Sequence, residues 1–267
     1  MLLKAGDLLH NRYQILRPIT AGGMGSVYEA HDNNLDGPCA VKEMHETRDA
    51  WVHRRFKEEA SLLSRLNHAD IPRVRDFFLE DNIGYIVMDF VQGSNLHQEI
   101  TQLRRAGANT TGGTKKGYTS DQATEVGLAV LGVLEYLHSL TPTVLHRDIK
   151  PSNIIRDDTT GKVKLVDFGL ARPLVDTTQT CAGTINFAAP EQLMGQADER
   201  SDLYGVGATL FFLVCGQPPP IGISKPVMML APDLDTRLAQ VIDRALDQDP
   251  ENRYSSATAM REALAAP

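Results

Sequence analysis

The chain has 267 residues, enough to form one large domain or two lobes around a sizeable core. Its formal net charge of −7 leaves no basic surplus to neutralise phosphates, which argues against a protein that binds nucleic acid by electrostatics. Three scattered cysteines fit a reducing compartment, and the longest apolar run, residues 203–215, is too short to span a bilayer. We therefore expect a cytoplasmic protein with no nucleic-acid partner and no membrane segment.

The first two predicted strands, residues 13–16 and 26–30, enclose the glycine-rich segment Thr-Ala-Gly-Gly-Met-Gly-Ser-Val at residues 20–27. Its glycines allow the backbone to approach a ligand closely and to point N–H groups at phosphate. Because a strand and not a helix follows, the pattern argues against a Rossmann or Walker-type loop. A plain glycine-rich hairpin turn is an equally good interpretation of this segment alone.

A third predicted strand, residues 39–44, carries Lys42 beside apolar residues. The helix predicted next, over residues 51–66, has on one face Val52, Phe56, Glu59, Leu63 and Leu66. A carboxylate on such a core-facing stripe is costly unless a cation pairs with it. Taken alone, Lys42 would be an edge or solvent-facing lysine, but an ion pair between Lys42 and Glu59 explains both residues.

Two further strands, predicted over residues 73–78 and 85–90, are followed by the break Val91-Gln92-Gly93. Five strands and one helix predict a small, sheet-rich lobe in residues 1–90. The remaining residues, 91–267, have the pattern of a larger and mostly helical lobe.

The second half begins with residues 104–117, whose four glycines and missing apolar period favour a flexible surface insertion over a mobile lid. Ser120 and Asp121 then predict the cap of a helix that ends at His138, which we interpret as a helix-end residue without chemistry. The core-facing residues of this helix are Val126, Val130, Leu131, Leu134 and Leu137.

The octapeptide His-Arg-Asp-Ile-Lys-Pro-Ser-Asn at residues 146–153 brings together a carboxylate, an ammonium group and a carboxamide. Pro151 disfavours a mid-helix position, and the apolar pairs at residues 144–145 and 154–155 predict short buried strands on either side. A polar loop held in this way favours a functional site. A solvated turn with chance charges is the alternative that the octapeptide alone leaves open.

Asp167 is a second carboxylate at the end of a predicted strand, residues 162–166, and begins the tripeptide Asp-Phe-Gly. On its own it could belong to a structural turn. Together with Asp148 and Asn153, however, it supplies the hard oxygen ligands that Mg²⁺ uses alongside nucleotide phosphates.

In chain order, these features are a glycine-rich hairpin, a Val-Lys strand, a helix glutamate, His-Arg-Asp-x-Lys-x-x-Asn, Asp-Phe-Gly and Ala-Pro-Glu at residues 189–191. The set resembles the protein-kinase signature, at family spacing and over nearly the whole chain. Lys150 is typical of serine/threonine kinases, and Gly-Gly-Met-Gly resembles the loop of bacterial eukaryotic-like serine/threonine kinases. The resemblance implies an α+β, bilobal fold, with a small antiparallel β-rich N-lobe that contains one main helix and a larger, mostly helical C-lobe.

The resemblance further implies ATP and Mg²⁺ as cofactors, with Mn²⁺ as an alternative to Mg²⁺. Lys42, held by Glu59, would bind the α- and β-phosphates, and Met88 would lie at the back of the nucleotide pocket. The residues implied to surround the nucleotide are Thr20, Gly22, Gly23, Gly25, Val27, Ala40, Met88, Asp89, Val91 and Ile155. Thr20 stands where the family has its first glycine, so we expect an altered nucleotide affinity.

The catalytic roles that the resemblance implies fall on the octapeptide and on Asp167. Asp148 would orient the serine or threonine hydroxyl of a protein substrate, or of the chain itself, and accept its proton. Lys150 would steady the transferring phosphoryl group, and Asn153 and Asp167 would hold the metal ions. Positioning and charge neutralisation would supply most of the catalysis.

Other residues of the family pattern have scaffold roles. Glu191 and Arg253 would form a buried ion pair, and Asp202, opening the apolar helix of residues 202–215, would hold the backbone of the 146–153 loop. The residues implied to stack into a spine are Leu63, Val74, His146 and Phe168. The proline-rich residues 217–233 depart from the pattern, because a helix that helps to dock substrates usually occupies this region.

Regulation is implied by Arg147, which in the family often binds a phosphate on the activation segment. We predict autophosphorylation at one or more of Thr177, Thr178 and Thr180, and Thr184 is placed to contact the catalytic residues. The alternative is that these threonines form a polar surface loop.

Three functions remain to be separated. The first is an active serine/threonine protein kinase, and the second is a catalytically weak kinase-fold module that binds a nucleotide or a partner. The retention of Lys42, Asp148 and Asp167 favours the first. The third is a small-molecule phosphotransferase, against which Lys150 and Glu191 argue.

Overall fold

A computed structural model of the protein describes residues 3–22, 25–44, 50–107, 117–168, 185–221 and 226–266. Within these ranges the side chains of residues 21, 22, 50, 51, 55, 59 and 107 lie outside the description. The chain divides into two compact units, the first in residues 1–92 and the second beginning at Gly93.

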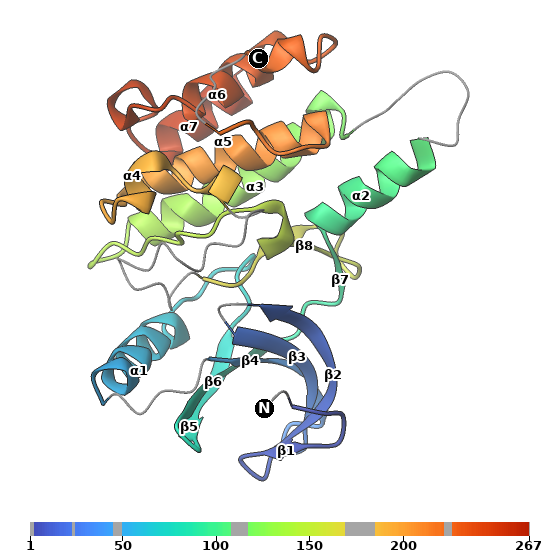
Figure 1. Cartoon of the computed structure of the whole chain (residues 1–267), viewed down its shortest axis with the longest axis vertical. Helices are drawn as coiled ribbons and strands as arrows, with labels where there is room; N and C mark the ends of the chain where they lie inside the picture. The colour runs from blue at the N-terminus through green and yellow to red at the C-terminus, as the bar shows by residue number, and fades with distance from the viewer. Residues whose placement is uncertain are drawn as a thin grey trace. The chain divides into compact units, whose positions relative to one another are not determined.

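The first unit consists of β1 (Leu8–Leu9), β2 (Tyr13–Gly22), β3 (Gly25–Asp32), β4 (Gly37–Glu43), α1 (Ala50–Ser64), β5 (Val74–Glu80) and β6 (Ile83–Asp89). Its strands form one antiparallel sheet in the order β1-β2-β3-β4-β6-β5 (Figure 1). The sequence predicted the five longer strands and missed β1, because two residues are too few to show a period.

One cluster of buried side chains forms the core of this sheet. Along β3 buried residues alternate strictly with partly exposed ones, as expected for a strand with one face on a core. The buried residues of the cluster are Leu9, Tyr13, Ile15, Tyr28, Ala30, Cys39, Val41, Tyr85 and Val87. The alternation shows which side chains of β3 point away from the core.

Helix α1 packs against β5 and β6. Phe56 and Leu63 are buried as predicted. A Cβ atom on Gly84 would lie 2.9 Å from the Phe56 ring, so the glycine makes room for this contact. The predicted stripe is wrong at its ends: Val52 is 38% exposed, and Leu66, although buried, follows the last helical residue. Periodicity identifies a face but not how far along the helix that face is covered.

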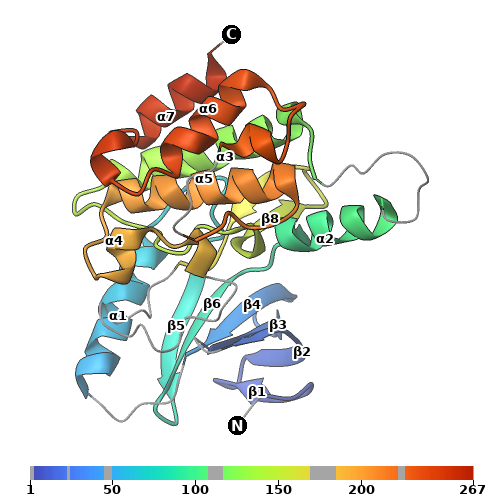
Figure 2. The same cartoon turned by 45° about the horizontal axis from the view of Figure 1, so that its top comes forward.

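The second unit contains β7 (Gly93–Asn95), α2 (Leu96–Gly107), α3 (Ser120–His138), β8 (Ile154–Asp157), β9 (Val163–Leu165), α4 (Pro190–Leu193), α5 (Glu199–Cys215), α6 (Thr236–Ala245) and α7 (Ala257–Ala265). Helices α3, α6 and α7 contact α5 (Figure 2), and β7, β8 and β9 form a small antiparallel sheet. The predicted α+β class, with a β-rich first part and a mostly helical second part, is confirmed.

Helix α5 is buried on all of its sides, since every residue from Ser201 to Cys215 is buried. The prediction of a buried helix in the longest apolar run is therefore confirmed, although the helix begins earlier, at Glu199. Asp198 caps its start, and Gly216, with φ of +70°, closes its end in the left-handed conformation that glycine adopts readily. No helix in the described parts of the chain is long and apolar enough to cross a membrane.

Helix α3 has its five predicted core residues buried. Its cap, however, is Thr119 and not Ser120 or Asp121. The Thr119 side chain accepts a hydrogen bond from the Gln122 N–H, and the Gln122 side chain accepts one from the Thr119 N–H. This reciprocal pair is a capping box, which satisfies two donors at the helix start.

Two predictions about the small sheet are wrong. Residues 144–145 form no strand, although one was predicted there. The segment predicted as a break ends at Gly93, which is in fact the first residue of β7, and β7 and β9 are the two strands that pair with β8. A Cβ atom on Gly93 would lie 1.9 Å from the Arg156 carbonyl oxygen, so glycine is needed for this close pairing. The insertion predicted over residues 104–117 also starts later, because α2 continues to Gly107; residues 108–116 lie outside the description.

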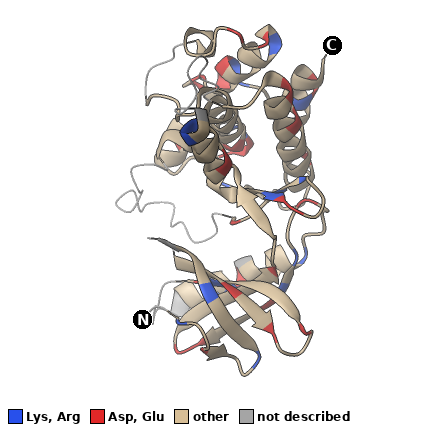
Figure 3. Ribbon diagram, turned by 90° about the vertical axis from the view of Figure 1, so that its right-hand side faces the viewer, with Lys and Arg blue, Asp and Glu red and all other residues tan. Residues whose placement is uncertain are grey.

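Between α5 and α6 the described residues contain one single-turn 3₁₀ helix, Val227–Met229. The helix that helps to dock substrates in the family is therefore reduced to one turn in the described part of residues 217–233. Residues 222–225 are outside the description. Positions with basic and acidic side chains are interspersed along the strands and helices of each unit (Figure 3).

Candidate active site

The backbone of the 146–153 loop is tied to α5 by Asp202, which is 2% exposed. One carboxylate oxygen accepts a hydrogen bond from the His146 N–H at 2.9 Å, and the other accepts one from the Arg147 N–H at 2.7 Å. The predicted role of Asp202 is thereby confirmed. Ile149 of the loop also packs against α5, where a Cβ atom on Gly205 would lie 2.8 Å from the Ile149 Cβ.

Arg147 adopts a left-handed backbone conformation, with φ of +65°. For a residue other than glycine this conformation costs about 1–3 kcal/mol and persists where the surroundings hold it. The Arg147 carbonyl accepts a hydrogen bond of 2.6 Å from Nε2 of Gln192, a residue of α4. Side chains from two helices thus hold both backbone polar groups of Arg147.

Asp148, Lys150 and Asn153, which the sequence groups within one loop, also lie together in space. Lys150 Nζ is 2.8 Å from Oδ2 of Asp148. Asn153 Nδ2 donates to the same oxygen at 2.9 Å and to the Asp148 carbonyl at 2.9 Å. Asp148 and Asn153 are 7% and 5% exposed. Charge-assisted contacts therefore fix the orientation of one nearly buried carboxylate.

His146, the first residue of the loop, is fully buried. Burial lowers its pKa below the usual value of 6.5, although the nearby carboxylates of Asp202, Asp148 and Asp167 oppose that shift. Its ring centroid lies 4.6 Å from that of Phe168, which confirms this part of the predicted spine. Neutral imidazole can accept a hydrogen bond, and Nδ1 accepts one from the Asp148 N–H at 3.3 Å.

Asp167 follows β9 with φ of +61°, a left-handed conformation, and is joined to the loop through Asn153. The Val166 N–H donates to the Asn153 carbonyl at 2.9 Å, and Asn153 Nδ2 lies 3.5 Å from the Asp167 carbonyl. Since the amide nitrogen of Asn153 is committed to Asp148, its amide oxygen is the atom that it could offer to a cation. Gly169, the last residue of the tripeptide, is outside the description.

This donor set fits a magnesium ion that is shared with a nucleotide. Among the described residues no group of three or more His, Cys, Asp and Glu side chains could hold a metal ion. The oxygens of Asn153 and Asp167 are hard ligands, and Mg²⁺ is commonly bound by one or two carboxylates together with substrate phosphates. Such an ion would complete its coordination with phosphate oxygens and water.

In the first unit, strand pairing brings several of the predicted nucleotide-binding residues into register. Val27 of β3 pairs with Lys42 of β4, and Ala40 of β4 pairs with Met88 of β6. Lys42 is 9% exposed. The side chain of Glu59 lies outside the description, so the predicted Lys42–Glu59 ion pair stays a prediction.

The predicted glycine-rich segment is a hairpin between β2 and β3. Thr20 pairs with Val27, and Gly22 pairs with Gly25 across the ends of the strands, while Gly23 is outside the description. Gly25 has φ of +122°, and a Cβ atom there would lie 2.0 Å from the Glu43 carbonyl oxygen. Glycine is therefore required at position 25 by the fold itself, whatever its role toward a ligand.

Asp89, Val91 and Ile155 complete the set of predicted nucleotide-binding residues. The Asp89 N–H donates to the Arg73 carbonyl at 2.9 Å, so the group that Asp89 could offer to an adenine edge is its own carbonyl. Val91 is 8% exposed, near the end of the first unit. Ile155 is partly buried in β8 of the second unit and pairs with Asn95.

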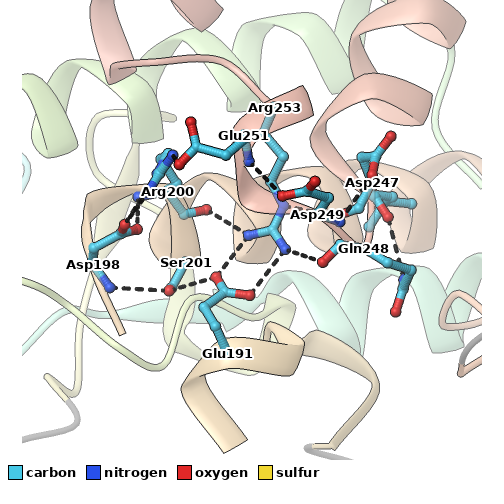
Figure 4. A network of polar contacts seen from close by, with 10 residues as sticks. Glu191, Asp198, Arg200, Ser201, Asp247, Gln248, Asp249, Glu251 and Arg253 are labelled. Carbon is cyan, nitrogen blue, oxygen red and sulfur yellow. Dashed lines mark hydrogen bonds and ion pairs between the residues drawn. The ribbon is translucent and has the colours of Figure 1, made fainter. Parts of the chain in front are cut away.

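A network of polar contacts holds α4 to the rest of the second unit (Figure 4). Arg253 makes a bidentate ion pair with Glu191, at 2.7 and 3.0 Å, and its side chain is fully buried. The Ser201 hydroxyl donates to Glu191 at 2.7 Å. Burial alone would raise the pKa of Glu191, but the hydrogen bonds from Arg253 and Ser201 outweigh burial and keep it below the usual value. The predicted buried pair is confirmed.

Two contacts that support the loop, one of them through Asp202, were not predicted from the sequence. His138, interpreted as a residue without chemistry, places Nε2 3.1 Å from the Asp202 oxygen that also holds the His146 N–H. Gln192 contacts the Arg147 carbonyl. Neither contact has a sequence signal, because the partners are 64 and 45 positions apart and neither belongs to a motif pair.

A carboxylate paired with a lysine, an asparagine beside it, and a second carboxylate at a strand end form the catalytic pattern of phosphoryl-transfer enzymes of the protein-kinase class. The comparison with known families agrees with this assignment. A family model described as "Protein kinase domain" matches residues 13–265, and the chain belongs to the protein kinase family. Members of the family use ATP with a divalent metal and act on protein substrates.

Curated relatives are bacterial serine/threonine kinases. Serine/threonine-protein kinase B of Synechocystis is 34% identical and covers 97% of this chain, and Serine/threonine-protein kinase C of the same organism is 32% identical and covers 96%. The chain spans only 47% and 50% of the lengths of these two proteins. Among solved structures, a variant of the PknI kinase domain from Mycobacterium tuberculosis has 27% identity and a TM-score of 0.79, with 99% of this chain and 98% of that chain covered.

Proposed function

We propose that this chain is the catalytic domain of a serine/threonine protein kinase, which transfers the γ-phosphate of ATP to serine or threonine hydroxyls of proteins. The observation that carries the proposal is the arrangement around Asp148, whose carboxylate is nearly buried and held by Lys150 and Asn153. A carboxylate fixed in this way can orient a hydroxyl group and accept its proton as the phosphoryl group is transferred. Because ATP is the proposed donor, we expect the domain to act in the cytoplasm.

Lys150 and Asn153 have separate tasks in this proposal. Lys150, already 2.8 Å from Asp148, would neutralise charge on the transferring phosphoryl group, where negative charge develops. Asn153 would turn its amide oxygen toward a metal ion while its amide nitrogen keeps Asp148 oriented. A bound Mg²⁺–ATP complex would supply the phosphoryl group and the charge neutralisation between its phosphates.

The first unit would supply the nucleotide-covering side of the domain. Lys42 would bind the α- and β-phosphates with support from Glu59, Val27 and Ala40 would contact the adenine, and Met88 would lie at the back of the nucleotide pocket. The register of β3, β4 and β6 supports this assignment, because it sets these side chains on adjacent strands. Thr20, Gly22, Gly23 and Gly25 would cover the phosphates, and Asp89, Val91 and Ile155 would complete the adenine pocket.

We also infer that the chain phosphorylates itself on the activation segment. The candidate threonines, Thr177, Thr178, Thr180 and Thr184, lie outside the description. Support comes from Arg147, whose side chain precedes the proposed catalytic carboxylate and could bind a phosphate. Mass spectrometry of the protein, made with and without Asp148→Asn, tests this inference: equal phosphate on both proteins would rule out self-modification.

The test of the main function is transfer from Mg²⁺ and labelled ATP to a generic basic protein and to the chain itself. We expect Asp148→Asn to lower turnover about 10²- to 10⁴-fold, the usual contribution of a positioned acid–base group, without loss of ATP binding. Asp167→Ala should weaken the binding of Mg²⁺–ATP. Asp158→Asn is the matched control, since Asp158 is an exposed carboxylate that follows β8 and undergoes the same chemical change.

The outcomes separate the candidate functions. Nucleotide binding without transfer under any condition would favour the non-catalytic binding module. Transfer to small molecules but not to proteins would favour a small-molecule phosphotransferase.

A further inference from the structure

The left-handed conformation of Arg147 is held by hydrogen bonds to its backbone N–H and carbonyl groups. Nε of Arg147 is buried and has no hydrogen-bond partner among the residues that the structure describes. The N–H group, in contrast, donates to Asp202, and the carbonyl accepts from Gln192. These two contacts therefore stabilise a backbone conformation that would otherwise be unfavourable.

The two holding side chains come from elements that are themselves fixed. Asp202 belongs to the buried helix α5. Gln192 belongs to α4, a helix of one turn. The residue before it in the same helix, Glu191, is bound by Arg253 and Ser201 (Figure 4). The position of the Gln192 amide thus depends on the buried ion pair next to it, and Gln192 connects that ion pair to the Arg147 carbonyl of the loop.

The direction of Asp148 depends on the conformation of the residue before it. If Arg147 relaxed to an ordinary right-handed or extended conformation, the peptide plane between Arg147 and Asp148 would rotate. That rotation would displace the Asp148 carboxylate from Lys150 and Asn153. Displacements of about 1 Å at a reacting group can lower a rate about 10²-fold.

We propose that Gln192 is a positioning residue for phosphoryl transfer. Its amide N–H group holds the Arg147 carbonyl, keeps Arg147 in the left-handed conformation and thereby orients Asp148. The consequence for the rate rests on the proposed kinase function, whereas the consequence for the loop does not. Gln192 touches neither a substrate nor the reacting atoms, and it acts through Arg147.

Two substitutions separate the hydrogen bond from the shape of the side chain. Gln192→Glu keeps the size of the side chain but replaces the donor by an acceptor, which would face the Arg147 carbonyl. Gln192→Lys restores a donor of sufficient length. Gln196→Glu is the matched control, because Gln196 is an exposed residue of the same segment and undergoes the same chemical change.

The first measurement is hydrogen–deuterium exchange in the peptide that contains residues 146–153, which needs no enzyme activity. We expect exchange at least about tenfold faster in Gln192→Glu, and near wild-type exchange in Gln192→Lys and Gln196→Glu. Unchanged exchange in Gln192→Glu would overturn the proposal. So would equal loss of protection in Gln192→Glu and Gln192→Lys, since a merely structural role of α4 would affect both.

The second measurement is steady-state kinetics with a protein substrate. We expect Gln192→Glu to lower kcat about tenfold or more, which corresponds to about 1.4 kcal/mol, with KM for ATP within about twofold of wild type. Gln192→Lys should recover most of kcat. A loss expressed mainly in KM would contradict the proposed route through Asp148. If wild type transfers no phosphate, the proposed function fails, and the exchange experiment alone still decides the role of Gln192.

Discussion

The contact between Gly205 and Ile149 offers a direct way to displace the catalytic loop from its scaffold. A Cβ atom at position 205 would lie 2.8 Å from the Ile149 Cβ and 3.1 Å from the Ile149 carbonyl oxygen. Ordinary contact begins near 3.4 Å, so Gly205→Ala requires the loop or the helix to move by about 0.6 Å. Because α5 is packed on all sides, we expect the loop to move instead.

The magnitudes follow from this displacement. Overpacking of a core costs about 1–3 kcal/mol, and the better helix propensity of alanine returns up to about 1 kcal/mol. The loss of stability should therefore be modest. Ile149 directly follows Asp148, however, and a shift of several tenths of an ångström next to the reacting carboxylate should lower kcat about 10- to 100-fold.

Gly207→Ala is the matched control for this prediction. It adds the same atom to the same helix, but the Cβ atom would lie 2.6 Å from that of Ala245 in α6, away from the catalytic loop. We expect both variants to unfold at lower urea concentration, and only Gly205→Ala to lose kcat in a phosphate-transfer assay under conditions where both proteins are folded. Equal kcat for the two variants would refute the reasoning.

Three further predictions concern the groups that support the loop. Arg253→Met leaves the Glu191 carboxylate without its cation, and we expect the free energy of unfolding in urea to fall by about 3–5 kcal/mol. Asp202→Ala leaves two backbone N–H groups without acceptors, at about 1–3 kcal/mol each, and exchange of the loop amides should become faster. Because burial lowers the pKa of His146 below 6.5, its neutral form is favoured in the folded state, and stability should fall as the pH drops below about 6.5. His146→Phe should flatten that part of a stability–pH profile.

Each of these predictions has a contradicting result. An apolar double variant, Arg253→Met with Glu191→Leu, should regain stability over Arg253→Met alone, and no recovery would show that the buried charge is not the cause. Faster exchange that is uniform over the second unit of Asp202→Ala would indicate global destabilisation. Parallel stability–pH profiles for wild type and His146→Phe would exclude His146 as the titrating group.

The residues around Asp148 could be predicted from the sequence because they are close along the chain. Asp148, Lys150 and Asn153 occupy one short loop, and a loop of this length keeps their side chains within reach of one another. The pairing of Glu191 with Arg253 was predicted from the family resemblance. The buried helix α5 was predicted from its long apolar run. In these cases either local spacing or a motif carried the information.

Contacts that depend on tertiary packing had no such signal. His138 of α3 contacts Asp202, which holds the loop, and Gln192 of α4 contacts the loop itself; neither contact leaves a period or a motif in the sequence. The error at residues 144–145 has a similar origin, because two apolar residues predict burial but not a hydrogen-bonding partner. The cap of α3 is a different case: Thr119 and Gln122 carry the spacing of a capping box, which the sequence does contain.

The burial of α5 on all sides has a consequence for how the second unit can be divided. A helix with no polar face cannot be stable in water by itself, and it would expose apolar surface if α3, α6 or α7 were removed. Fragments that end before α6 should therefore aggregate and not fold into a smaller domain. The second unit should unfold in one cooperative step, with α5 as the element that cannot form before its neighbours.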